Sequence, residues 1–223
     1  MKSKRLLCIA KLIEKYKRGE ILADIGSDHG YLPIYLVKEK VITKAYACDI
    51  GQGPLNASKE NIKLNQLENK VIPLLGSGMN PIIDKDVDMI SLCGMGGLLI
   101  CEILDEYDIS SYRFFLQANS AIDLLRHYLN THHLKIIDEA IVEDGHHIYE
   151  VIVCEYGESQ LNEDDELFGP ILRIKKDPLF IKKWTRELGI QYKILSSLTS
   201  QHPKYAETLR LINKIEGEIN ESK

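Results

Sequence analysis

The chain has 223 residues, of which 44% are hydrophobic, and a formal net charge of −5. This composition is typical of a globular protein with one ordinary domain and a smaller addition. It excludes a protein that coats nucleic acid with uniform positive charge, and no apolar run approaches the roughly 20 residues that a transmembrane helix needs.

The N-terminal segment, residues 1–18, is basic, with seven Lys or Arg and one acid, Glu14. Lys11 and Lys15 interrupt it before a long apolar stretch develops, which argues against a signal peptide and favours a cytoplasmic protein. Five cysteines without a Cys-x-x-Cys pair predict reduced thiols and no metal site.

Residues 1–156 alternate short apolar runs with helical stretches, as expected of an α/β domain. Strands are predicted at 21–25, 45–50, 71–75, 89–92 and 114–117, and helices at 32–38, 55–65, 98–104 and 124–130. Apolar strands separated by helices predict a parallel sheet covered on both faces. Two further runs, 134–142 and 148–155, are joined by a short segment with Gly145 and predict an antiparallel hairpin. This order is that of a Rossmann-like methyltransferase domain.

A second, helical domain is expected over residues 157–223. Residues 157–169 are acidic and poor in apolar side chains, which predicts a linker. Apolar residues return at helical spacing over 170–199 and again after Pro203. The two apolar stripes predict an antiparallel pair of helices.

A glycine-containing turn follows the first predicted strand and leads into a helix. A dinucleotide fingerprint would require Gly at positions 28 and 31, where Asp28 and Tyr31 stand. Asp28 would repel a pyrophosphate, whereas the ammonium and sulfonium groups of S-adenosylmethionine (SAM) are positive and suit carboxylates. We therefore predict a SAM site that includes Asp24, Gly26, Ser27, Asp28, His29 and Gly30.

The second and third strands carry further candidates for the cofactor site. Asp49, followed by Ile50, ends the second strand, where an acid can accept hydrogen bonds from ribose hydroxyls. The turn Ser77-Gly78-Met79 ends the third strand with a soft apolar side chain suited to flank the adenine.

The fourth strand ends in a glycine-rich turn, Cys93-Gly94-Met95-Gly96-Gly97. This turn lacks the Asn/Asp-Pro-Pro-aromatic motif of methyltransferases that act on the amino group of adenine. It leaves room for a flat base or for the methyl donor, and we include Cys93 and Gly94 in the cofactor site. A tight strand-to-helix turn is the structural alternative, with Cys93 either a cleft thiol or a buried spectator.

Eight segments carry a resemblance to a known family: residues 24–33, 53–54, 94–97, 116–119, 143–145, 149–150, 168–170 and 182–184. Together they resemble the bacterial TrmK family. The family's members methylate N1 of adenosine 22 in tRNA, and have a Rossmann-like catalytic domain and a coiled-coil-like C-terminal helical domain. The resemblance implies this activity, SAM as cofactor and tRNA as partner. Ser77 stands where the family often has Asp, and Ala118 where it often has Pro.

Adenine N1 has a lone pair and no proton, so methylation there needs no general base. Because the product is cationic, we expect the Asp28 carboxylate to stabilise it; otherwise Asp28 only binds the cofactor's ammonium or caps a helix. Tyr31 is a candidate to stack on the target base, Asn119 to bond its edge and Met95 to lie beside it. Core or capping roles for Tyr31 and Asn119 are the alternative.

The expected phosphate contacts for tRNA are the basic residues of the N-terminal segment, taken as a helix, and those of residues 175–186, which include Lys182 and Lys183. Solvated charged faces are the other interpretation of these clusters. Two other functions stay open: a methyltransferase of a small molecule or protein, and a non-catalytic RNA-binding protein on the same fold. No membrane or metal partner is expected; the sequence does not fix the oligomeric state, and a monomer is favoured.

Overall fold

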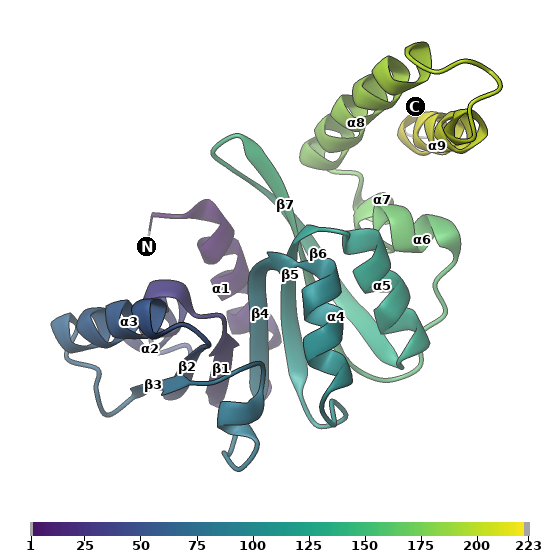
Figure 1. The fold of residues 1–223 in the computed structure, drawn as a ribbon. Coiled ribbons are helices and arrows are strands. Elements are labelled where there is room, and N and C mark those ends of the chain that lie inside the picture. Colours follow the sequence, from purple (N-terminus) through teal and green to yellow (C-terminus); the bar gives the residue numbers. More distant parts are fainter. Residues whose placement is uncertain (1, 221–223) are drawn as a thin grey trace. The chain divides into compact units, whose positions relative to one another are not determined.

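The computed structural model describes residues 2–220 of the chain. Residues 1 and 221–223, the outer ends of the domains predicted at 1–156 and 157–223, lie outside the described residues. The chain divides into two compact units between Leu161 and Asn162, and each unit is described by itself (Figure 1).

A seven-stranded sheet forms the centre of the first unit, in the order β3-β2-β1-β4-β5-β7-β6. Neighbouring strands are parallel from β3 to β5, and β7 runs antiparallel to both β5 and β6. The predicted parallel strands with a terminal hairpin are therefore confirmed. The strands are β1 (Ile21–Ile25), β2 (Lys44–Asp49), β3 (Val71–Leu75), β4 (Met89–Gly96), β5 (Arg113–Ser120), β6 (Leu134–Asp144) and β7 (His147–Tyr156).

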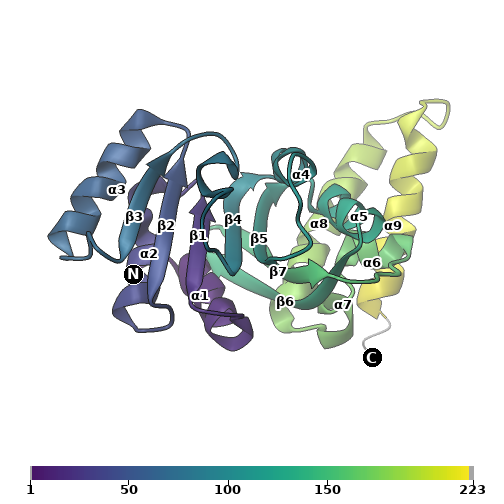
Figure 2. The same cartoon turned by 90° about the horizontal axis from the view of Figure 1, so that it is seen from below.

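Helices cover both faces of this sheet. Figure 2 shows α1 (Lys4–Tyr16) and α2 (Tyr31–Lys38) on one face, with α4 (Gly97–Asp105) and α5 (Ile122–Thr131) on the other. Helix α3 (Gln52–Leu64) packs on β2 and β3. Two 3-10 turns, η1 (Asp28–Gly30) and η2 (Asn80–Ile82), lie after β1 and after β3. Burial of apolar side chains between α1, α2 and the sheet makes the main core, which includes Ile9, Ile13, Leu36 and Phe115.

Helix α1 confirms the helix expected for the basic N-terminal segment, and it is tied to the tip of the β6–β7 hairpin. The Ser3 side chain caps the helix by accepting a hydrogen bond from the Leu6 N–H at 3.2 Å. The Ser3 hydroxyl also donates to the Asp144 carboxylate at 2.6 Å, and the Arg5 N–H donates to the same oxygen at 3.0 Å. The hydrogen bond from Ser3 lowers the pKa of Asp144, so the carboxylate stays ionised and holds the first turn of α1 in place.

A buried ion triad joins α5 to the β6–β7 hairpin. The Arg126 guanidinium donates from Nε to Glu139 at 2.9 Å and from Nη2 to Glu150 at 2.8 Å. The side chains of Arg126 and Glu139 have no exposed area, and that of Glu150 is 2% exposed. Charges so deeply buried are tolerated only because they are paired.

The second unit is helical, with α6 (Glu163–Phe168), α7 (Leu172–Lys175), α8 (Pro178–Ser196) and α9 (Lys204–Asn220). Helices α8 and α9 pack together, and the Tyr192 hydroxyl donates to Glu216 across them at 2.5 Å. The linker predicted at 157–169 is wrong over its second half, where α6 forms. Asn162 and Asp165 make a capping box there, and acids in a first helical turn are favoured by the helix dipole.

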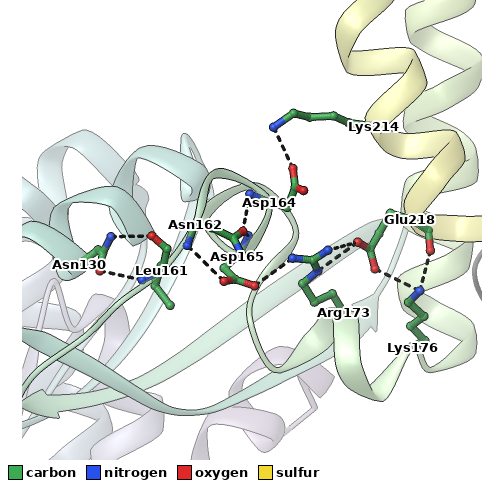
Figure 3. A network of polar contacts seen from close by, with 9 residues as sticks. All are labelled: Asn130, Leu161, Asn162, Asp164, Asp165, Arg173, Lys176, Lys214 and Glu218. Carbon is green, nitrogen blue, oxygen red and sulfur yellow. Dashed lines mark hydrogen bonds and ion pairs between the residues drawn. The ribbon is translucent and has the colours of Figure 1, made fainter.

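Much of the charge of the second unit is paired within it, as Figure 3 shows. Arg173 bonds Asp165 at 3.0 Å and Glu218 at 2.7 Å, and Lys176 pairs with Glu218 at 3.2 Å. Lys214 lies 3.0 Å from Glu163. The acidic segment is thus partly neutralised by Arg173 of α7 and Lys214 of α9.

Candidate active site

The turn after β1 is held against β2 by backbone hydrogen bonds. The N–H groups of Gly26 and Ser27 both donate to the Cys48 carbonyl at 2.9 Å. The Ser27 carbonyl accepts from the Ser58 hydroxyl of α3 at 3.0 Å. Gly26 has φ +74°, a left-handed conformation that glycine adopts without strain. The turn is therefore fixed before any ligand binds.

Asp24 points from the end of β1 into a buried polar pocket. Its side chain accepts a hydrogen bond from the Ser91 hydroxyl of β4 at 2.6 Å. Burial raises the pKa of Asp24 above its ordinary value, opposed by hydroxyl hydrogen bonding. The buried Ser27 hydroxyl beside it has no partner of good hydrogen-bond geometry within residues 2–220. A cationic group placed here would be stabilised by Asp24, and its N–H groups could satisfy Ser27.

A cavity of about 240 Å³ opens above these residues, which we call the β1–β4 cavity. It brings the turn after β1 together with the end of β4, two regions far apart in the sequence. Arg5 of α1 also lines it, a residue the sequence analysis did not assign to the site. Its walls are Arg5, Leu6, Asp24, Gly26, Asp28, His29, Tyr31, Leu32, Cys93 and Gly94.

Asp28, His29 and Tyr31 form the mouth of this cavity. The Asp28 side chain is 69% exposed and its carboxylate lies 3.5 Å from His29 Nε2. The rings of His29 and Tyr31 stack, with centroids 5.3 Å apart and planes 14° from parallel. Half of Tyr31 is exposed, so the predicted stacking residue presents its ring to solvent. Gly30, by contrast, is buried.

The ends of β4 and β5 are joined by a polar network centred on Gln117. Its buried side-chain oxygen accepts from Arg5 Nη1 and from the Gly94 N–H, the latter at 3.1 Å. Its amide donates to Asn119 at 3.0 Å, and Asn119 in turn donates to the Gly94 carbonyl at 2.8 Å. Asn119 therefore fixes the glycine-rich turn through the Gly94 carbonyl, and it is itself exposed to solvent.

Met95 and Cys93 form part of the apolar lining of the site. Met95 Cε would lie 2.2 Å from a Cβ added at Gly26, so the Met95 side chain packs directly on that glycine. Burial raises the pKa of Cys93, whose thiol donates to the Phe115 carbonyl at 3.6 Å. The thiol is therefore neutral, a weaker nucleophile than a thiolate.

The residues predicted around the ribose and adenine separate into two groups. Asp49 ends β2, where one of its oxygens accepts from the Gly51 N–H at 2.8 Å, and Ile50 beside it is 74% exposed. Ser77 is exposed after β3, near Asp49, whose carbonyl accepts from the Gly76 N–H at 3.0 Å. Met79 is buried and lines a different cavity, where Tyr107 lies close to Gly78.

Lys182 and Lys183 lie on α8 in the second unit. Lys183 Nζ is 4.6 Å from the centre of the Trp184 ring, and Trp184 is buried against Phe168. Trp184 is thus a core residue of this unit. Among residues 2–220, no helix has the length and apolar character to cross a bilayer, and no His, Cys, Asp or Glu cluster could bind a metal ion.

The fold and the site define a Rossmann-like SAM-dependent methyltransferase. The chain matches the family model TrmK, tRNA (adenine(22)-N(1))-methyltransferase, over residues 22–221. It is 35% identical over 195 residues to the tRNA (adenine(22)-N(1))-methyltransferase of Bacillus subtilis, covering 83% of this chain and 81% of that protein. The chain belongs to the TrmK family, which confirms the resemblance of its motifs.

Solved structures agree over nearly the whole chain. A Streptococcus pneumoniae chain in complex with S-adenosyl-L-methionine is 33% identical, with a TM-score of 0.90, over 98% of this chain and 100% of that one. M. capricolum TrmK in complex with S-adenosyl-homocysteine is 32% identical, with a TM-score of 0.88, over 99% and 98% of the two chains. The prediction of SAM as cofactor is confirmed.

Proposed function

We propose that this protein transfers the methyl group of SAM to N1 of adenosine 22 in tRNA. The observation that carries the proposal is the family match over residues 22–221, because it includes most of the residues that line the β1–β4 cavity and nearly all of the helical unit. The activity implies a cytoplasmic enzyme, since bacterial tRNA is cytoplasmic. We take the monomer as the acting species.

The residues around the β1–β4 cavity fit the cofactor in charge and shape. We assign the methionine ammonium to Asp24 and Asp28, with Ser27, His29 and Gly30 completing the wall. Within residues 2–220 the buried Asp24 carboxylate forms no ion pair, and its bonded partner is the neutral Ser91 hydroxyl, which supports this assignment. Gly26 also gives Met95 the room to pack on the turn, because Met95 Cε would lie 2.2 Å from a Cβ at this position.

The other end of the cofactor is assigned to the edge formed by β2 and β3. One Asp49 oxygen is held by Gly51, which orients the carboxylate toward the ribose hydroxyls. The exposed Ile50 side chain supplies an apolar face for the adenine, with Ser77 and Gly78 behind it. Met79 would support this wall from below rather than contact the ligand. Cys93 and Gly94 close the site near the sulfur.

Bound SAM supplies an electrophilic methyl group on a sulfonium, and the chain's own residues orient the acceptor. We propose that Tyr31 stacks on the target adenine, since its ring is half exposed at the cavity mouth. Asn119, fixed by Gln117 and Gly94, would bond the edge of the base, with Met95 packed alongside. Positioning N1 in line with the methyl group while excluding water accounts for most of the catalysis.

Asp28 is proposed to stabilise the positive charge that develops on the adenine ring. Its carboxylate stands at the mouth of the cavity and is 69% exposed before substrate binds. When the target adenine stacks over the cavity mouth, the Asp28 carboxylate would lose contact with water. Its attraction to the positive charge on the adenine ring would then be stronger.

Substitution of Asp28 by Asn separates catalysis from cofactor binding. We expect Asp28→Asn to lower the single-turnover rate at saturating SAM and tRNA by about 10- to 100-fold. Asp86→Asn is the matched control, because Asp86 is exposed and outside both the cavity and its mouth. If the Asp28→Asn variant loses SAM affinity but turns over normally at saturation, Asp28 has no catalytic role.

A larger groove leads away from the cavity along α2 and offers a path for the RNA. Its volume is about 590 Å³, and it shares Leu6 and Tyr31 with the β1–β4 cavity. Lys2 and Lys38 line it, as expected of a surface that receives phosphates. Together with Lys182 and Lys183 of the second unit, these residues are the proposed tRNA contacts.

A further inference from the structure

The groove along α2, which we call the α2 groove, contains an aromatic ring, Tyr35, that the proposed reaction does not use. Its volume of about 590 Å³ lies within the roughly 300–1,000 Å³ of pockets that bind a small molecule. The groove continues from the mouth of the β1–β4 cavity, because Leu6 and Tyr31 line both. Its aromatic and charged walls are Tyr31, Tyr35, Lys2, Lys38 and Glu39.

Tyr31, Tyr35 and Lys38 form one stripe along α2. Their spacing of four and then three residues places them on the same face of the helix. Tyr31 is half exposed, and Tyr35 is partly buried against the main core. The two tyrosine positions are about 6 Å apart along the helix axis, farther than the roughly 3.4 Å between bases stacked in one strand. Two bases placed on these two rings would therefore be unstacked from each other.

Asn65 holds the Lys38 ammonium at the α2 groove. Lys38 Nζ donates to Asn65 Oδ1 at 2.9 Å, and Asn65 Nδ2 donates to the Asn61 carbonyl of α3 at 2.8 Å. The second bond fixes the amide with its oxygen toward the lysine. An ammonium has three N–H donors, so two remain for a phosphate. Lys2 and Lys38 also outnumber Glu39, the one acid among the described residues that line the groove.

Methylation at N1 has a consequence for the base next to the target. N1 lies on the Watson–Crick edge of adenine, so the target base must be unpaired and turned out of its stack to meet the methyl group. The neighbouring base then loses a stacking partner. An aromatic side chain can take the place of that partner, because any base can stack on such a ring. Tyr35 lies one helical turn beyond Tyr31, the residue proposed to stack on the target.

We propose that the α2 groove is a second nucleotide site, which holds the nucleotide adjoining the target adenosine. The base of this nucleotide stacks on Tyr35, and its phosphate is bound by Lys38. The inference rests on the proposed function and deepens it, because the protein would hold two consecutive nucleotides of the tRNA apart from each other. Tyr35 and Lys38 are binding residues in this account and have no part in the chemical step.

Two substitutions of Tyr35 test the stacking contact. Tyr35→Leu removes the ring but keeps an apolar side chain against the core, whereas Tyr35→Phe keeps the ring. Tyr35→Leu should lower kcat/KM for an unmodified tRNA transcript about 10-fold, and Tyr35→Phe should stay within about twofold of wild type. Calorimetry should find the S-adenosylhomocysteine affinity of both variants unchanged. Equal activity of Tyr35→Leu and wild type would overturn the proposal.

Transcripts that lack a single base locate the contact through a double-mutant cycle. The abasic nucleotide is placed immediately 5′ of the target adenosine, immediately 3′ of it or, as the control, in the anticodon loop. One of the two adjoining positions should abolish the effect of Tyr35→Leu, since no base is left to stack on the ring. The control transcript should keep the effect at about 10-fold. An equal effect of Tyr35→Leu on all the transcripts would show a purely structural role and overturn the proposal.

The salt dependence of tRNA binding tests the phosphate contact. In a mobility shift, Lys38→Gln should reduce the slope of log affinity against log salt by about 0.7–0.9, the value for one phosphate. Lys70→Gln is the matched control, because Lys70 is exposed and directly precedes β3, at the opposite edge of the sheet from the site. An unchanged slope for Lys38→Gln would overturn the assignment of Lys38.

These outcomes distinguish the α2 groove from the reaction itself. The proposed function would stand and the second nucleotide site would fall if wild-type protein methylates adenosine 22 and Tyr35→Leu matches it on every transcript. Wild-type protein that transfers no methyl group to any tRNA would overturn both.

Discussion

Replacement of Arg126 by Met tests how the β6–β7 hairpin is attached to the rest of the sheet. The substitution keeps most of the side-chain volume and removes the cation between Glu139 and Glu150. Their side chains are 0% and 2% exposed, so both carboxylates would stay in the interior without the guanidinium that pairs with them. Breaking a buried ion pair in this way costs about 3–5 kcal/mol, a large part of the roughly 5–15 kcal/mol that stabilises a typical domain.

Urea denaturation followed by circular dichroism measures this loss as a change in the free energy of unfolding. Lys17→Met is the matched control, since the Lys17–Glu20 pair is 37% and 47% exposed and its loss should cost about 1 kcal/mol or less. Adding Glu139→Leu and Glu150→Leu to Arg126→Met should recover more than half of the stability, because no unpaired charge remains buried. A loss for Arg126→Met no larger than that for Lys17→Met would refute the reasoning.

Three further predictions concern the cofactor site, the packing around Gly97 and the proposed tRNA surface. Because burial raises the pKa of Asp24 and the cofactor's ammonium needs the ionised form, S-adenosylhomocysteine affinity should be full above that pKa and fall as pH drops through it. Calorimetry between about pH 5 and pH 8 checks this, and Asp24→Asn should flatten the dependence. Gly97→Ala should cost about 1–3 kcal/mol in urea unfolding, since its Cβ would lie 2.3 Å from a backbone carbonyl, whereas Gly53→Ala has open space and should cost nothing. Reversal of Lys182 and Lys183 to Glu should weaken tRNA binding in a mobility shift by about tenfold at moderate salt and leave calorimetric SAM affinity unchanged; unaltered tRNA affinity would exclude this surface.

Much of the fold could be predicted because its strands are short, apolar and bounded by turn residues. Asp24 and Asp49 come at the ends of β1 and β2, so the parallel topology alone places them at one edge of the sheet. The acidic helix α6 was missed because its charge suggested a linker. Its capping residues, Asn162 and Asp165, were a signal available in the sequence.

Arg5 could not be assigned to the site from the sequence. Arg5 forms a hydrogen bond with Gln117, which is 112 residues away in the sequence. No local sequence pattern predicts a contact between residues so far apart. The pairing depends on how α1 packs over the sheet and on the capping of that helix by Ser3 and Asp144. The one hint in the sequence was Gln117, a polar residue directly after the apolar run of residues 114–116. Met79, in contrast, was assigned to the cofactor site from the sequence but lines a different cavity. Its position after β3 does not determine which cavity its side chain enters.

The most direct test of the central claim is methyl transfer from labelled SAM to an unmodified tRNA transcript, followed by nucleoside digestion and mass identification. The account predicts N1-methyladenosine from a transcript with adenosine at position 22, and none when that adenosine is replaced by guanosine. Label in another nucleoside, equal label in both transcripts, or no label despite measurable SAM binding would contradict it.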